Sequence, residues 1–193
     1  ISATIIVGQD GFSRPSLSNY FDSLKTSPLS LNIASYVGHN TVRQKVMGND
    51  FKREATIDEI EAMKKLIARD MQSGALGLST GLEYDPGIYS NTQEVIEMAK
   101  VASQYGGRYI SHMRSEDMYL EQSIDEILRV GKETNMPVQI SHFKLARKGL
   151  WGKAAKILTI LDSARSDGID VTADIYPYQY WQSTMTVLFP KRD

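Results

Sequence analysis

Apolar residues in this chain fall into two alternating patterns, short apolar runs and longer stretches with helical spacing. The short runs predict six strands, at residues 3–7, 29–37, 75–79, 109–112, 138–142 and 169–175. Helical spacing predicts helices between them, at residues 17–24, 56–71, 93–105, 118–134 and 153–166. Residues 40–55 are polar without a clear period, so we interpret them as an inserted loop or a short helix. The pattern therefore predicts repeated strand–helix units.

Two of the expected helices begin with a capping-box pattern, in which a Ser or Thr is followed three residues later by a Glu or Gln. Thr56 and Glu59 form one such pair, and Ser90 and Gln93 form the other. We therefore expect these two helices to be capped at Thr56 and at Ser90.

The expected strands begin roughly 30 residues apart, except at the inserted segment, which is the period of a β-α-β unit. Such units build either a doubly wound open sheet or a (β/α)8 barrel, and both bind ligands at the carboxyl ends of the strands. No glycine-rich nucleotide-binding motif follows any strand, so we favour the barrel. Six units cannot close an eight-stranded barrel. We expect residues 1–193 to be its central part, lacking the first and last strands, with Phe189–Asp193 preceding the last unit.

The composition is that of a globular protein, with 193 residues of which 41% are hydrophobic and 23% are charged. Its 22 basic and 23 acidic residues give a net charge of -1 without blocks of like charge, which argues against nucleic acid as a partner. No apolar run approaches the roughly 20 residues that cross a bilayer, and the start at Ile1 lacks the features of a signal peptide. We expect no membrane association and a cytoplasmic location.

Two histidines stand at the ends of consecutive expected strands, His112 and His142, each preceded by Ile-Ser. Neighbouring strands lie about 4.8 Å apart, which would bring both imidazoles to one metal ion. The chain has no cysteine, so the third ligand must be a carboxylate, with Asp10 as the first candidate and Asp174 as the second. The alternative for each of them is structural, as a hydrogen-bonded histidine or a turn-forming aspartate. We give this structural role to His39, which also follows a strand.

Six short motifs, in order along nearly the whole chain, resemble those of the N-acyl-D-amino-acid deacylases (D-aminoacylases) of the amidohydrolase superfamily. They are Gly8–Ser13, Gly38–Arg43, Ser79–Gly87, Ser111–Glu116, Ile140–Lys144 and Asp174–Tyr178. The resemblance implies an incomplete (β/α)8 TIM barrel of the amidohydrolase type, in which the expected strands are the second to the seventh. It also implies a hydrolase in which zinc activates water to cleave a small-molecule N-acyl-D-amino acid into a carboxylate and a D-amino acid.

The resemblance assigns metal binding to His112 and His142. Asp10 stands where the family commonly has a bridging cysteine, so a hard carboxylate replaces a soft thiolate and should loosen the preference for zinc. The resemblance therefore implies one tight metal site with an unusual third ligand.

The resemblance also implies a substrate-binding group. Tyr84 and Lys144 match positions that bind the carboxylate of the substrate, and a phenol and an ammonium are suitable donors for it. Tyr176 is a weaker match, because Tyr178 fits the same motif. Arg114 either pairs with Glu116 or helps to shape the site.

The family's histidine pair on the first strand and its general-base aspartate on the eighth are absent from the matched motifs. We therefore expect an incomplete second zinc site, no catalytic base in this chain and little activity from the chain alone. Its open sheet edges should favour self-association. Two alternatives stay open: another amidohydrolase, such as a cyclic amidase or a dipeptidase, and a non-catalytic barrel module without metal.

Overall fold

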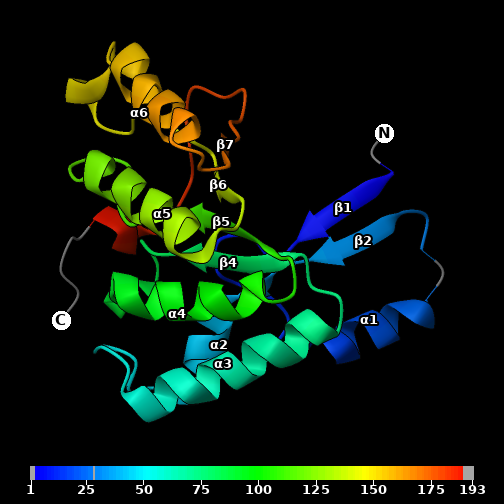
Figure 1. The fold of residues 1–193 in the computed structure, drawn as a ribbon. Coiled ribbons are helices and arrows are strands. Elements are labelled where there is room, and N and C mark those ends of the chain that lie inside the picture. The colour runs from blue at the N-terminus through cyan, green and yellow to red at the C-terminus, as the bar shows by residue number, and fades with distance from the viewer. Residues whose placement is uncertain (1–2, 28, 189–193) are drawn as a thin grey trace.

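Parallel strands form the centre of the molecule in the computed structural model, which describes residues 3–27 and 29–188 (Figure 1). The main sheet contains, in spatial order, β3 (Val37–Gly38), β4 (Gly77–Gly81), β5 (Arg108–His112), β6 (Val138–Ile140) and β7 (Val171–Ala173). A second sheet pairs β1 (Thr4–Val7) with β2 (Asn32–Ser35). Every one of these pairings is parallel. The spatial order follows the chain order without a reversal, as in a barrel and unlike a doubly wound sheet.

Tyr36 divides the strand that the sequence predicts at residues 29–37 into β2 and β3. Its backbone N–H donates to the carbonyl of Val7 at 3.0 Å, and the N–H of Leu76 donates to the carbonyl of Ser35 at 2.9 Å. Hydrogen bonds therefore join the two sheets across the break, and β1 follows the same order as the other strands.

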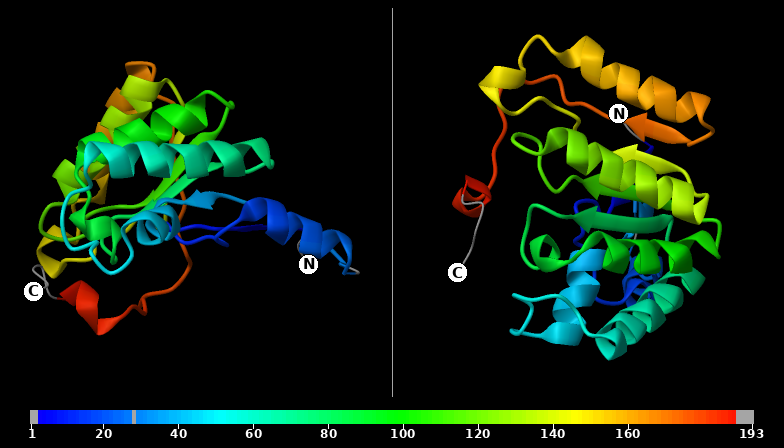
Figure 2. Two further views of the ribbon diagram at one scale, coloured as in Figure 1. Left: turned by 90° about the horizontal axis from the view of Figure 1, so that it is seen from below. Right: turned by 60° about the vertical axis from the view of Figure 1, so that its left-hand side comes forward.

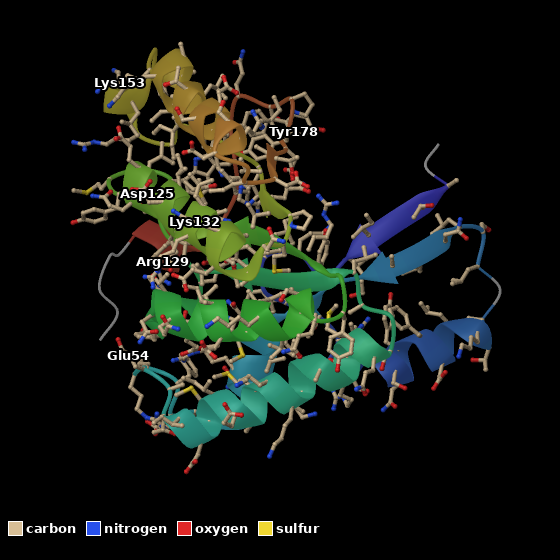
Figure 3. All side chains as sticks on the ribbon, viewed as in Figure 1. Glu54, Asp125, Arg129, Lys132, Lys153 and Tyr178 are labelled. Carbon is tan, nitrogen blue, oxygen red and sulfur yellow. The ribbon has the colours of Figure 1, made fainter. Side chains whose placement is uncertain are left out.

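Helices cover one face of the strands, as Figure 2 shows for α3 to α6. The helices are α1 (Leu17–Lys25), α2 (His39–Met47), α3 (Ile57–Gln72), α4 (Thr92–Ser103), α5 (Leu120–Thr134) and α6 (Ala154–Ser166). Three short 3-10 turns are η1 (Gly87–Tyr89), η2 (Lys148–Leu150) and η3 (Met185–Leu188). On α5, Asp125, Arg129 and Lys132 are exposed (Figure 3), whereas Ile124 and Ile127 on its other side are buried. This two-sided helix is what the periodicity predicts.

The core lies between the main sheet and these helices. It is built from apolar side chains of both layers, including Leu78, Tyr109, Val138, Met63, Ile67, Ile96 and Ile124, all fully buried. The arm formed by β1, β2 and α1 extends away from the main sheet in Figure 1. There Ile5 and Ile6 are 42% and 44% exposed. Burial therefore concentrates around β4, β5 and β6, whose ends carry the residues of interest.

The two predicted helix caps have different outcomes. The capping box of Thr56 and Glu59 is confirmed, with both of its hydrogen bonds present. The expected cap at Ser90 is wrong, because the Ser90 hydroxyl donates to the carbonyl of Gly87 at 2.7 Å and closes the η1 turn. Asn91 caps α4 instead, and its side chain accepts from the N–H of Glu94 at 2.9 Å.

The polar segment 40–55 contains α2, which starts at His39 directly after β3. This agrees with the short-helix alternative for the first half of the segment. Ile1, Ser2 and Phe189–Asp193, to which the expectations about the chain ends refer, lie outside the described residues. Among residues 3–27 and 29–188, no helix combines the length and apolar character needed to cross a membrane.

Candidate metal and substrate site

One pocket at the carboxyl ends of the strands collects most of the candidate residues. Its lining includes Asp10, Tyr84, His112, His142, Lys144 and Tyr176. They lie at or shortly after the carboxyl ends of β1, β4, β5, β6 and β7. Because the strands are parallel, their carboxyl ends meet at one edge, and residues far apart in the sequence come together there.

Three side chains in the pocket could hold one metal ion. His112 Nδ1 lies 2.9 Å from His142 Nε2, and Asp10 Oδ1 lies 3.7 Å from that same His142 atom. The three ligand atoms are all within 4.8 Å of one another. Tetrahedral ligands about 2.0–2.1 Å from zinc would be separated by roughly 3.3 Å. The nitrogen and oxygen donors therefore fit a small divalent cation, and Asp10 supplies an oxygen where a thiolate would favour zinc more strongly.

Two of these three residues have unusual backbone conformations. Asp10 has φ of 54° and His142 has φ of 39°, and Asn135 is the third non-glycine residue with positive φ in the described part of the chain. Such conformations cost of order 1–3 kcal/mol and concentrate at functional sites. The turn at His142 is held by Asp174, whose Oδ1 accepts from the His142 N–H at 2.6 Å. Asp174, our second candidate ligand, thus supports the backbone of His142 and is not one of the three side chains grouped above.

Close packing brings Asp10 to the end of β4. A Cβ atom on Gly81 would lie 2.2 Å from the Asp10 carbonyl oxygen, so only glycine permits this approach. Asn40 fixes the other side of Gly81, donating from Nδ2 to its carbonyl at 2.9 Å. The Ser79 hydroxyl accepts from the N–H of Gly11 at 3.2 Å and ties the turn to the strand. The Asp10 turn is therefore positioned by β4 and α2.

Charges around His142 are balanced by two carboxylates. Burial lowers the pKa of His142, but Asp10 and Glu116 outweigh it and raise that pKa to about 9. Burial raises the pKa of Asp10, but His142, His112 and Lys144 together hold it below its ordinary value. In this arrangement His142 is positively charged at neutral pH, with a proton on each ring nitrogen. A cation that binds there would displace one of these protons.

Tyr84 and Lys144 flank the two histidines. The Tyr84 hydroxyl lies 3.0 Å from His112 Nδ1, and the two rings are 4.3 Å apart. Burial raises the pKa of Tyr84, so it stays a neutral donor. Lys144 Nζ forms an ion pair with Glu116 and lies 5.7 Å from the centre of the Tyr176 ring. The pocket thus offers a phenol and an ammonium close to the three-ligand group.

The two tyrosines of the last motif differ in position. Tyr176 lines the pocket, and its buried hydroxyl has no hydrogen-bond partner among the described residues. Tyr178 is 66% exposed and stacks on Tyr176 with ring centres 6.3 Å apart. An unpartnered buried hydroxyl suits a ligand oxygen, so Tyr176 is the better candidate for binding substrate.

Arg114 lies outside this pocket, which differs from our expectation. Its Nε and Nη2 donate to Glu126 at 2.9 and 2.8 Å, and Nη1 donates to the carbonyl of Ile88. Glu116, which was one of the two alternatives for Arg114, pairs with Lys144 instead. The side chain turns toward α5 because the largely buried carboxylate of Glu126 lies there. These hydrogen bonds of Arg114 therefore join α5 to the η1 segment.

His39 has the structural role that the sequence suggested. Its Nε2 lies 2.8 Å from Glu94 Oε1, and both side chains are fully buried. Arg43 binds the same carboxylate oxygen at 2.9 Å and donates to the backbone carbonyls of Phe51 and Pro86. This cluster fixes the segment before α4 and lies away from the pocket lining.

Sequence reasoning missed two carboxylates that touch the histidines. Glu83 Oε2 lies 2.8 Å from His112 Nε2, and Glu116 Oε1 lies 3.0 Å from His142 Nδ1. Both residues also line the pocket. The one available signal was their position, shortly after the ends of β4 and β5, and this does not specify the direction of a side chain.

Comparisons with known proteins agree with the geometry. No family model matches the chain. A D-aminoacylase from Alcaligenes xylosoxydans xylosoxydans is 39% identical over 160 residues, which is 83% of this chain and 33% of that protein. The chain spans about a third of the length of the curated relatives that it matches.

Solved structures show the same fold. A crystal structure of a D-aminoacylase, assigned to a novel subset of amidohydrolases, matches 91% of this chain with a TM-score of 0.86 and 35% identity. An N-acyl-D-glutamate deacylase from Bordetella bronchiseptica, complexed with zinc and a phosphonate inhibitor, matches 91% with a TM-score of 0.87 and 30% identity. In each case the match covers 42% of the solved chain. The fold prediction of a partial amidohydrolase-type parallel α/β barrel is therefore confirmed.

Proposed function

We propose that this chain is part of a D-aminoacylase-type amidohydrolase and that the full-length protein is a metal-dependent N-acyl-D-amino-acid deacylase, which its similarity to such enzymes supports. Residues 1–193 would be the central part of its catalytic barrel. The reaction would hydrolyse the amide of an N-acyl-D-amino acid to a carboxylate and a free D-amino acid. The observation that carries the proposal is the group of Asp10, His112 and His142 in one pocket.

We propose that these three residues hold zinc or a similar cation. Their nitrogen and oxygen donors suit such an ion, and the related deacylase structure contains zinc. When bound, the ion would polarise the amide carbonyl and lower the pKa of water in the pocket. The oxygen ligand from Asp10 should make the preference for zinc over other divalent ions weaker than a thiolate would.

Three other residues would hold the carboxylate of the substrate. Lys144 supplies a positive charge, while Tyr84 and Tyr176 supply neutral O–H donors on either side of the histidines. The unpartnered hydroxyl of Tyr176 and the raised pKa of Tyr84 both support this role. Fixing the carboxylate would orient the amide toward the metal ligands. Arg114 is left out, because it pairs with Glu126.

We assign no general base among the described residues. As the resemblance implies, we propose that this aspartate and the histidine pair of a second metal site belong to a part of the full-length protein outside this chain. Self-association through open sheet edges and a cytoplasmic location also stay predictions. Light scattering of the isolated chain would test the first of these.

The test uses the full-length protein. We expect bound zinc and hydrolysis of N-acetyl-D-amino acids, and loss of both in a variant with His112→Ala and His142→Ala. Wild-type activity in that double variant would overturn the proposal. Hydrolysis of cyclic ureides in place of acylated D-amino acids would point to another amidohydrolase. Less than roughly 0.2 metal per chain after refolding with zinc would point to a module without metal.

A further inference from the structure

Each of the two histidines proposed to bind metal contacts a carboxylate through the ring nitrogen on the side opposite to the proposed metal position. His112 Nδ1 and His142 Nε2 face each other at 2.9 Å beside Asp10. The opposite ring nitrogens contact carboxylates, His112 Nε2 with Glu83 at 2.8 Å and His142 Nδ1 with Glu116 at 3.0 Å. We propose that Glu83 and Glu116 are positioning residues that present the inner nitrogens of the two histidines to the metal. This inference rests on the metal site in the proposed function.

The chemistry of imidazole gives the carboxylates this role. A neutral histidine has one N–H and one lone pair, and the partner of the N–H decides which nitrogen is free to bind a metal. A carboxylate behind His112 places the proton on Nε2 and the lone pair on Nδ1. The Tyr84 hydroxyl, 3.0 Å from Nδ1, is a donor that also requires a lone pair there. Outer partners of this kind fix ring orientation and raise the basicity of the ligand.

The two histidines need opposite tautomers. His112 presents Nδ1 to the proposed metal position, whereas His142 presents Nε2 to it. Glu83 lies on the Nε2 side of the first ring and Glu116 on the Nδ1 side of the second. The carboxylates are therefore placed on the ring positions that each tautomer requires.

Glu116 contacts two residues of the site. Its Oε1 accepts from His142 Nδ1, and its Oε2 pairs with Lys144. Lys144 Nζ and His142 Nδ1 are 2.9 Å apart, and the carboxylate accepts from both donors. Glu116 thus connects a metal ligand to the residue proposed to bind the substrate carboxylate.

The ion pair of Glu116 with Lys144 adds a second readout to the test. The two readouts are zinc affinity from chelator competition and KM for an N-acetyl-D-amino acid. In the full-length protein we expect Glu83→Gln and Glu116→Gln each to weaken zinc binding about ten- to a hundredfold. Glu116→Gln should also raise KM several-fold at saturating zinc, because it removes the negative partner of Lys144. Glu121→Gln is the matched control, because Glu121 is 54% exposed and pairs with Lys156 on the surface.

The outcomes separate this inference from the proposed function. Unchanged zinc affinity in both variants, with loss of zinc in His112→Ala, would overturn the inference alone. A wild-type protein that binds no zinc would overturn both. Loss of a whole equivalent of metal in Glu83→Gln would show that Glu83 is itself a ligand, which also overturns the positioning role. If circular dichroism shows that Glu83→Gln does not fold, Glu83→Asp, which retracts the carboxylate from His112, should still weaken zinc binding.

Discussion

Two clusters in this protein contain the same chemical groups, a histidine, a glutamate and a cation. In one, Glu94 binds His39 and Arg43, and the three side chains are 0–1% exposed. In the other, Glu116 binds His142 and Lys144, with exposures of 6%, 21% and 18%. We call the first the sealed cluster, because its side chains are buried and can only support the fold. We call the second the open cluster, because its ring nitrogen and its ammonium group face a pocket. Solvent access, and not residue type, distinguishes the buried structural cluster from the cluster that we propose to be functional.

The largest expected effect comes from breaking the sealed cluster. Arg43→Met leaves the buried Glu94 carboxylate short of a cation and removes donors from the carbonyls of Phe51 and Pro86. We expect the free energy of unfolding to fall by about 3–5 kcal/mol, measured by urea denaturation. Arg129→Met, on an arginine that is 52% exposed, should change it by less than about 0.5 kcal/mol. A loss below 1 kcal/mol for Arg43→Met would contradict the structural role.

The open cluster should respond in the opposite way. His142→Ala is expected to weaken zinc binding of the full-length protein by more than about a hundredfold, because a ligand should matter more than its outer partner. In the presence of chelator, its unfolding free energy should change by less than about 1 kcal/mol, since the ring is 21% exposed and its backbone is strained. His39→Ala should show the reverse, with lower stability and normal zinc per folded molecule. Equal loss of zinc in His142→Ala and His39→Ala would contradict the distinction between the two clusters.

Acid should weaken the sealed cluster in a specific pH range. Burial raises the pKa of Glu94, but His39 and Arg43 outweigh this and hold it below its ordinary value of 4.5. A carboxylate with a lowered folded pKa adds stability above pH 4.5 and loses it as the pH falls through the folded value. The wild type should therefore lose stability below about pH 4.5 more steeply than Glu94→Gln. Parallel curves of unfolding free energy against pH would contradict this.

The smallest effect should distinguish the two tyrosines beside the open cluster. Tyr176→Phe removes a buried hydroxyl that has no described partner, whereas Tyr178→Phe alters a ring that is 66% exposed. We expect KM for an N-acetyl-D-amino acid to rise several-fold in the first variant and to stay unchanged in the second. Steady-state kinetics of the full-length protein would check this, and a larger rise in the second variant would reverse the assignment.

Much of the fold was predictable because its signals are local. Short apolar runs marked each strand, and the periodicity of α3, α4 and α5 agreed with their buried sides. The failures arose where a tertiary contact overrides a local pattern. Ser90 looks like a helix cap but bonds to Gly87 across the η1 turn. Tyr36 interrupts a run that reads as one strand, because the chain changes partners there from β1 to β4.

The site shows the same difference between local signals and tertiary contacts. Parallel strands bring their ends together, so His112, His142 and Asp10 could be gathered from sequence order alone. The roles of Glu83 and Arg114 could not, because both lie beyond a strand end, where alternation no longer determines the direction of a side chain. Their partners were settled by packing against neighbouring segments.

The two Ile-Ser-His tripeptides are identical in sequence, yet they are not interchangeable parts. His112 ends a regular strand, while His142 sits in a left-handed turn that Asp174, from the next unit along the chain, holds in place. A copy of the second tripeptide grafted onto another barrel would lack this support and point its ring elsewhere. Duplication of one strand–helix unit would likewise not reproduce the ligand. A design or an evolutionary transfer of this centre must therefore move two neighbouring units together.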